Sequence, residues 1–264
     1  MTSTSSTSRS TLPTLGRQIS YEQRSYWRNP LAACFTFAFP LVFLVIFIAI
    51  FKNDTVELPG GSVKFAQYYV PNIICFGIIS ACYTNLSITT THRREVGLMK
   101  RARGTPLRPS IYIAGIVGNS ALIALILSTL VLVLGLTVYG VTFPNHLAAY
   151  VLTVLTGAFC FSSLGLFLST LIPNEDAAPA IVNFIIFPLL FISGSFAPVP
   201  LDSAIGRISS IFPIRHMNEA MNTVFDPFVE GSAISPDHLS VMLAWGIGGA
   251  ILTVVRFRWE PSTG

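Results

Sequence analysis

Residues 111–138, IYIAGIVGNSALIALILSTLVLVLGLTV, form an apolar run in which no residue carries a charge. An α-helix rises 1.5 Å per residue, so a helix over this run would be about 42 Å long. The hydrocarbon core of a bilayer is only about 30 Å thick. The run therefore predicts a helix that crosses a membrane.

Five further apolar runs lie on either side of this one, over residues 31–51, 66–91, 147–171, 178–198 and 239–255. Only 11% of the residues in the chain are charged, whereas about 25% are charged in an ordinary soluble domain. We therefore predict an all-α polytopic membrane protein, with six transmembrane helices in one domain over residues 30–264. Pro188 and Gly194 interrupt the fifth run and predict a kink there.

Three segments outside the runs have their own character. Residues 1–13 are rich in Ser and Thr and predict a disordered tail. Residues 14–29 alternate apolar, aromatic and basic side chains, which favours an amphipathic helix at the membrane interface; a solvated linker is the alternative. Residues 199–238 contain two semi-apolar stretches too short to span, which predict a re-entrant external segment between the fifth and sixth helices or an amphipathic lid.

The basic residues indicate the orientation of the chain. If the N-terminus is cytoplasmic, twelve Lys and Arg residues lie in cytoplasmic segments and four lie on the opposite side. This bias places both termini in the cytoplasm of a multi-pass protein of the plasma or bacterial inner membrane. The net charge of +4 comes from residues beside the spans, so nucleic acid is not expected as a partner.

The predicted spans lack ionisable groups, since every Asp, Glu, Lys, Arg and His lies outside them or at their ends. A transporter driven by protons or sodium usually needs such a group at mid-membrane, so transport would need another source of energy. None of the lysines, Lys52, Lys64 and Lys100, follows a glycine as in a P-loop. The chain therefore carries no ATPase site of its own, and we predict no catalytic residues, metal ligands or bound cofactor.

The loop at 91–110 carries six basic residues and a single acid, Glu95. Val96 and Met99 are three residues apart, which predicts that they share one face of a short amphipathic helix ended by Gly104 and Pro106. The positive-inside rule explains the basic residues without any partner. It does not explain Glu95 or the apolar pair, which favour a docking function.

Three groups of residues resemble the type-2 ABC exporter permeases, a family of drug, lipid and polysaccharide exporters. The first resembles the family's start of span one and comprises Arg24, Arg28, Asn29, Pro30 and Pro40. The second resembles its cytoplasmic loop and comprises Arg94, Glu95, Gly97, Lys100, Arg101, Pro106 or Pro109, and Tyr112. The third resembles its fifth span and external segment and comprises Ile192, Ser193, Gly194, Phe196, Pro198, Pro213, Glu219 and Ala220.

The resemblance implies a pair of permease subunits, identical or related, each bound to a soluble P-loop ATPase subunit that uses ATP and magnesium. Contact with the ATPase is implied for the interface helix and for loop residues Arg93, Arg94, Glu95, Gly97, Met99, Lys100 and Arg101. A substrate path along the second and fifth spans would be lined by Asn72, Phe76, Tyr83, Asn85, Asn183, Phe184, Phe187 and Phe191. The phenylalanines could equally face lipid or pack between helices.

The function that we expect is ATP-driven export of hydrophobic or amphiphilic compounds, either drugs or antibiotics or lipids, because an aromatic-lined path suits such cargo. An ion-coupled or passive membrane transporter is the main alternative, and a non-transporting membrane scaffold or sensor is a third. Survival of transport after ATP depletion would favour the second interpretation over the first.

Overall fold

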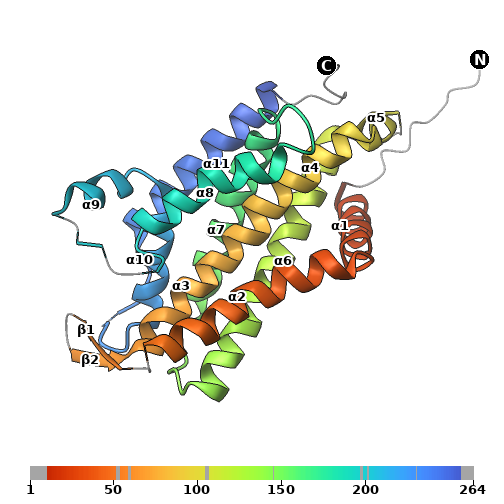
Figure 1. The fold of residues 1–264 in the computed structure, drawn as a ribbon. Coiled ribbons are helices and arrows are strands. Elements are labelled where there is room, and N and C mark those ends of the chain that lie inside the picture. Colours follow the sequence, from red (N-terminus) through yellow and green to blue (C-terminus); the bar gives the residue numbers. More distant parts are fainter. Residues whose placement is uncertain are drawn as a thin grey trace, which may run out of the picture.

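The computed structural model describes residues 11–51, 54–58, 61–104, 107–144, 146–196, 199–200, 202–229 and 231–256 (Figure 1). The first half contains α1 (Thr11–Trp27), α2 (Pro30–Ile50), β1 (Thr55–Leu58), β2 (Gly61–Lys64), α3 (Phe65–Ile79), the π-helical turn η1 (Ser80–Thr84), α4 (Asn85–Glu95) and α5 (Leu98–Arg103). The second contains α6 (Pro109–Val138), α7 (Leu147–Ser169), α8 (Ala178–Ile192), α9 (Ala204–Ser209), α10 (Pro213–Phe225) and α11 (Pro236–Arg256).

Five helical units are long and apolar enough to cross a membrane, namely α2, the continuous unit α3–η1–α4, α6, α7 and α11. They match five of the predicted spans and confirm an all-α polytopic membrane protein. The run at 178–198 forms α8, which is apolar but only 15 residues long. This helix continues through Pro188, and the chain turns at Gly194, whose φ of +79° favours glycine.

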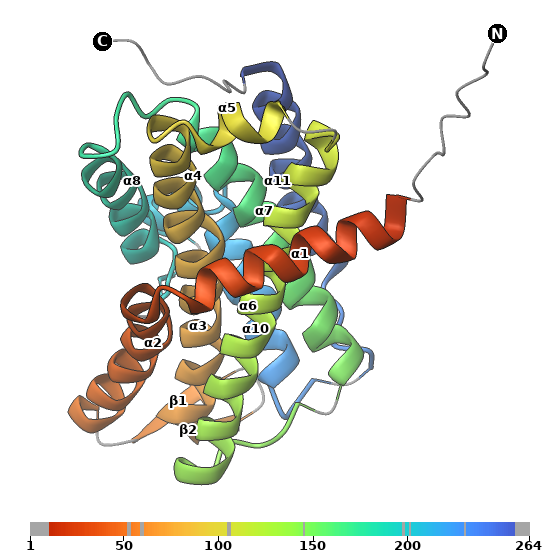
Figure 2. The ribbon, with the colours of Figure 1, turned by 90° about the vertical axis from the view of Figure 1, so that its right-hand side faces the viewer.

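The bundle has two distinct ends (Figures 1 and 2). One end carries α5 and the last turns of α11, and the other carries the antiparallel hairpin β1–β2. We call them the α5 end and the hairpin end. Figure 2 shows α1 lying across the bundle and over α6. Gly115 and Gly118 permit this crossing, because a Cβ at Gly115 would lie 2.3 Å from Cγ of Gln18 and one at Gly118 would lie 2.8 Å from Cδ1 of Ile19.

The helix predicted over residues 14–29 is present as α1, which begins three residues earlier, at Thr11. Part of the predicted tail is therefore helical, and its residues 1–10 lie outside the described residues. Its position at a membrane interface remains a prediction.

The core of the bundle is formed by α7 with α3 on one side and α11 on the other. Glycines bring these helices together, as small residues commonly do in membrane proteins. A Cβ at Gly246 or Gly249 of α11 would lie 3.1 Å from backbone atoms of α7, and one at Gly165 of α7 would lie 2.9 Å from backbone oxygens of η1. The backbones therefore pack almost directly on one another.

The predicted segment 199–238 contains two short helices, α9 and α10. One face of α10 is buried against α3, α7 and α11 and includes Met217 and Met221. The amide of Gln67 donates to the carbonyl of Phe225 over 2.6 Å. Since α10 is packed into the bundle, its position favours a re-entrant segment over a surface lid.

Arg215 is a buried cation of α10 that the sequence did not single out. Its guanidinium donates to the hydroxyl of Ser209 over 2.8 Å and to the carbonyl of Val199 over 3.2 Å. A partly exposed Glu219 lies one helical turn away, with 3.5 Å between the charged atoms. These contacts hold α9 and the start of the segment against α10.

Candidate functional site

The second predicted span is interrupted by the π-helical turn η1. The amide of Asn85 donates to the carbonyl of Ser80, five residues back, instead of four as in an α-helix. The hydroxyl of Ser87 lies 2.6 Å from the carbonyl oxygen of Tyr83 and 2.9 Å from that of Gly165 on α7, so it joins the turn to its neighbour. Such turns inside α-helices are frequent at functional sites.

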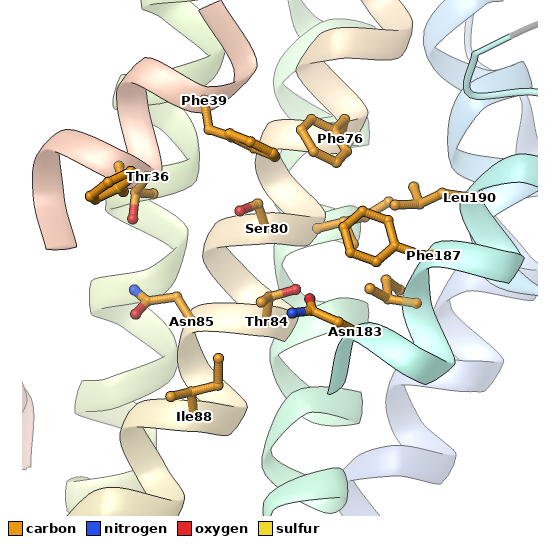
Figure 3. A pocket seen from close by; sticks show the side chains of 13 residues that line it. Thr36, Phe39, Phe76, Ser80, Thr84, Asn85, Ile88, Asn183, Phe187 and Leu190 are labelled. Carbon is orange, nitrogen blue, oxygen red and sulfur yellow. The ribbon is translucent and has the colours of Figure 1, made fainter. Parts of the chain in front are cut away.

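A cavity of about 340 Å³ lies beside η1, between α2, the α3–η1–α4 unit and α8 (Figure 3). We call it the first cavity. Its lining comprises Phe35, Thr36, Phe39, Phe76, Ile79, Ser80, Thr84, Asn85, Ile88, Asn183, Ile186, Phe187 and Leu190. Hydroxyls and carboxamides are its polar groups, and no lining residue carries a charge. Figure 3 shows Phe39, Phe76 and Phe187 around one part of the cavity, and Thr84 and Asn183 directed toward each other.

Four residues predicted for the substrate path line the first cavity: Phe76, Asn85, Asn183 and Phe187. The other four lie elsewhere. Asn72 is buried and donates to the carbonyl of Tyr68 over 3.0 Å, while Tyr83 belongs to the hydrophobic core. Phe184 and Phe191 are 80% and 65% exposed on α8.

Sequence analysis missed the contribution of α2 to the first cavity. Phe35, Thr36 and Phe39 complete the wall opposite α8. Thr36 interrupts an otherwise apolar stretch and is 8% exposed, so its hydroxyl was the available signal. A threonine readily bonds within its own helix, which is why this signal is weak.

A series of aromatic rings adjoins the first cavity. Phe76 of its lining lies 6.1 Å from Phe196, centroid to centroid. Phe196 lies 6.2 Å from Phe43 and 5.8 Å from Phe47, and Phe47 in turn stacks on Tyr69 at 5.1 Å.

Two arginines of the loop at 91–110 point into the protein. Arg94 is 5% exposed, and its guanidinium donates to the carbonyls of Ser169 and Ile172 over 2.8 and 2.6 Å. These carbonyls lie at and just beyond the C-terminus of α7, where backbone oxygens lack helical partners and attract cations. Arg94 therefore caps α7.

Arg93 joins the loop to α1. Its guanidinium lies 2.7 Å from the carboxylate of Glu22, whose side chain is only 2% exposed. Glu22 also accepts a hydrogen bond of 2.9 Å from Gln18 in α1. The helix across the bundle and the loop after the second span are thus fastened together by a buried ion pair.

Gly97 sets the direction of α5. Its φ of +72° lies in the left-handed region, and it separates α4 from α5. As a result Met99 is buried against Leu86 and Tyr112, whereas Val96 is 42% exposed. The prediction that Val96 and Met99 share one helix face is wrong, because the turn at Gly97 breaks the helical spacing. The predicted end of the short helix at Gly104 is confirmed.

The loop still presents side chains to the outside at the α5 end. Val96 and Leu98 are exposed apolar residues, and Lys100 and Arg101 are exposed bases. Glu95 accepts a hydrogen bond of 3.1 Å from Nε of Arg94 and is partly exposed. A mixed apolar and basic surface of this kind suits a protein partner with acidic groups.

His92 and His216 each lie three residues before a glutamate, a spacing that can place two metal ligands on one helix face. His92 pairs with Glu175, in the connection between α7 and α8, while Glu95 turns toward Arg94. Nδ1 of His216 lies 3.0 Å from Nδ1 of His238. Among the described residues, no group of three or more His, Cys, Asp or Glu side chains is arranged to hold a metal ion.

Comparison with known proteins relates this arrangement to membrane permeases. The chain is 24% identical over 230 residues to the inner membrane transport permease YhhJ of Escherichia coli strain K12, a match that covers 83% of this chain and 60% of that protein. It is 22% identical over 165 residues to YbhR of the same strain, described as a probable multidrug ABC transporter permease, covering 62% of this chain and 45% of that one. A third relative, the inner membrane transport permease YadH, is 24% identical over 182 residues, with 67% and 70% covered.

The chain thus spans less than two thirds of the length of YhhJ and less than half of YbhR. The family model described as ABC-2 type transporter matches residues 17–225, which include every wall of the first cavity and the loop around α5. Because this match covers well over half of the sequence, the chain belongs to the ABC-2 type transporter family.

Proposed function

We propose that the chain is the membrane-spanning permease subunit of an ATP-driven exporter that moves hydrophobic or amphiphilic compounds out of the cytoplasm. The first cavity is the observation that carries the proposal. Its aromatic walls and uncharged polar groups suit apolar cargo, and its lining offers no ionisable group for coupling to an ion gradient. The multidrug description of YbhR supports drug-like cargo for the same cavity.

Energy would come from a separate P-loop ATPase subunit that uses ATP and magnesium. We assign its docking surface to Val96, Leu98, Lys100 and Arg101, which are exposed at the α5 end. Movement of this surface would reach α7 through Arg94 and α1 through the Arg93–Glu22 pair. Both connections are made by short, charge-assisted hydrogen bonds, which transmit displacement better than loose apolar contacts.

A second permease copy, identical or related, would cover the exposed side of the first cavity. Phe35 on α2 is 64% exposed. On α8, Phe184 is 80% exposed and Phe191 is 65% exposed. Cargo or lipid would contact the same rings. Two facing copies would enclose a larger path without any change in the fold of either chain.

The orientation of the chain can be tested with single cysteines. In a variant without Cys34, Cys75, Cys82 and Cys160, a cysteine that replaces Lys100 should react with an impermeant maleimide only from the cytoplasmic side. A cysteine that replaces Ser232 should react only from outside. Both positions are exposed, so a cysteine that fails to react must lie on the other side of the membrane from the reagent and is not hidden inside the protein. Reversed labelling would overturn the proposed direction of transport and the docking surface.

Glu95 is partly exposed and directly precedes the docking surface in the chain, so replacing it with alanine should uncouple the exporter while leaving it folded. Arg94 keeps its two carbonyl partners without Glu95, so the loss of the 3.1 Å contact between the two side chains should leave the fold intact. We expect near-normal expression of Glu95→Ala. Substrate-stimulated ATP hydrolysis by the reconstituted complex with its ATPase should fall at least several-fold.

The matched control is Asp202→Ala, which removes an exposed acid in the segment that precedes α9. It should change neither expression nor hydrolysis. Normal transport by Glu95→Ala would limit the charged loop to a role in topology. Transport by the wild type that persists without ATP and stops when the proton gradient is abolished would replace the whole proposal by ion-coupled transport.

A further inference from the structure

A second cavity, of about 290 Å³, lies between α1, α4 and α6. Its lining differs from that of the first cavity, because it contains no phenylalanine and many residues that bear a hydroxyl or carboxamide, among them Ser25, Asn29, Thr89, Asn119 and Ser120. Asn85 lines both cavities, so the first and the second cavity adjoin at one side chain.

The charges around the second cavity are already paired. Arg93 reaches its wall but is held by the buried carboxylate of Glu22, and His92 is paired with Glu175. A ligand with a net charge would therefore meet no unpaired counter-charge and would have to lose its hydration shell. Hydroxyls and carboxamides, by contrast, both donate and accept hydrogen bonds, which suits a neutral group of the same kind.

The side chain of Asn119 belongs to the lining of the second cavity, next to that of Ser120. A carboxamide donates and accepts hydrogen bonds, and so does a hydroxyl. A ligand head group with hydroxyls or amides would find matching partners at this part of the wall.

We propose that the two cavities together bind one amphiphile, whose uncharged, hydrogen-bonding head group occupies the second cavity and whose apolar part lies between the aromatic rings of the first. This inference rests on the proposed function and names the class of cargo that it would carry. A sugar-like head group is the simplest example, since its hydroxyls match the hydroxyls and carboxamides of the wall.

The apolar part could be an alkyl chain, as in a lipid, or an aromatic ring system, as in a drug glycoside. Phe39, Phe76 and Phe187 would contact either one, but stacking favours flat rings. A comparison of octyl and naphthyl probes with the same head group therefore separates the two sources.

The test is photolabelling of the full-length chain in lipid nanodiscs, without ATP or an ATPase. The probes carry a diazirine in the apolar part and differ only in the head group, which is a β-glucoside, a carboxylate or a trimethylammonium. We expect the glucoside to label peptides of α2 and α8 around the first cavity in a saturable manner. The two charged probes should label these peptides at least fivefold less.

Asn119→Leu should weaken saturable labelling by the glucoside at least fivefold, because it replaces a hydrogen-bonding carboxamide in the lining of the second cavity with an apolar side chain. Thr129→Leu is the control on the same helix: Thr129 is exposed and bonds only within α6, to the carbonyl of Leu125. It should bind the glucoside like the wild type. Size-exclusion profiles of both variants would show whether they are folded.

Equal labelling by the charged probes would overturn the assignment of a neutral head group. Non-saturable labelling, or labelling spread over outward-facing residues of α11, would overturn the site itself, and both results come from the wild type alone. Because the assay needs no ATP, saturable labelling combined with absent transport would disprove ATP-driven export and leave the binding site standing.

Discussion

Valine in place of Gly165 should strongly destabilise the protein. A Cβ at this position would lie 2.9 Å from the carbonyl oxygens of Cys82 and Tyr83 and 3.1 Å from Cα of Tyr83. All three atoms belong to the backbone of η1, so no side chain can rotate away. Overpacking usually costs about 1 to 3 kcal/mol. We expect about 2 kcal/mol for alanine and about 3 kcal/mol or more for valine.

Gly248→Val provides the matched control. It places the same side chain inside another spanning helix, α11, where a Cβ at position 248 would meet nothing within 4 Å. Yield of monodisperse protein and the midpoint of thermal unfolding in detergent should fall sharply for Gly165→Val and little for Gly248→Val. Equal behaviour of the two variants would mean that η1 and α7 do not pack as closely as described.

The spans were predictable because the length of an apolar run can be read directly from the sequence. A run such as 111–138 has no alternative to a membrane helix, and α6 covers it fully. The length of α8 was not predictable, since both Pro188 and Gly194 were predicted interruptions, and the helix continues through Pro188 but ends before Gly194. Proline in a membrane helix is tolerated wherever neighbouring groups satisfy the freed carbonyl, and sequence does not identify those neighbours.

The π-helical turn escaped prediction for a related reason. Its residues, Ser80–Thr84, have no distinctive pattern, and the turn depends on contacts with α7 through Ser87 and Gly165. Ser80 and Thr84 of this turn line the first cavity. Half of the predicted path residues also line it, while others on the same helices, such as Asn72 and Phe184, are buried in the core or exposed on the outside.

The basic residues of the loop after the second span have two different structural roles that the sequence does not distinguish. Charge counting treats Arg93, Arg94, Lys100 and Arg101 alike, since the positive-inside rule depends only on the side of the membrane on which a basic residue lies. In the structure the first two are buried in contacts with α1 and α7, and the last two are exposed. Of these four, Lys100 and Arg101 make neither of these internal contacts and are the pair assigned to the proposed docking surface.

Arg94→Ala should accordingly affect folding, in contrast to changes at the exposed bases. The substitution removes charge-assisted hydrogen bonds to Ser169 and Ile172 and leaves their carbonyl oxygens buried at the end of α7. Hydrogen bonds to charged groups contribute about 1.5 to 3 kcal/mol each. Because a lost pair is partly compensated by water, we expect a total loss of about 3 kcal/mol, visible as a lower unfolding midpoint and reduced expression.

Two comparisons make this prediction specific. Arg94→Lys keeps the charge but can reach only one carbonyl well, since lysine lacks the planar fork of the guanidinium, so about half of the loss should remain. Arg101→Ala removes an exposed base of the same loop and should leave the unfolding midpoint unchanged. If Arg94→Ala unfolds like the wild type and only loses stimulated ATP hydrolysis, the guanidinium is not a cap of α7. It would then turn outward to the ATPase, and α7 would have to end without it.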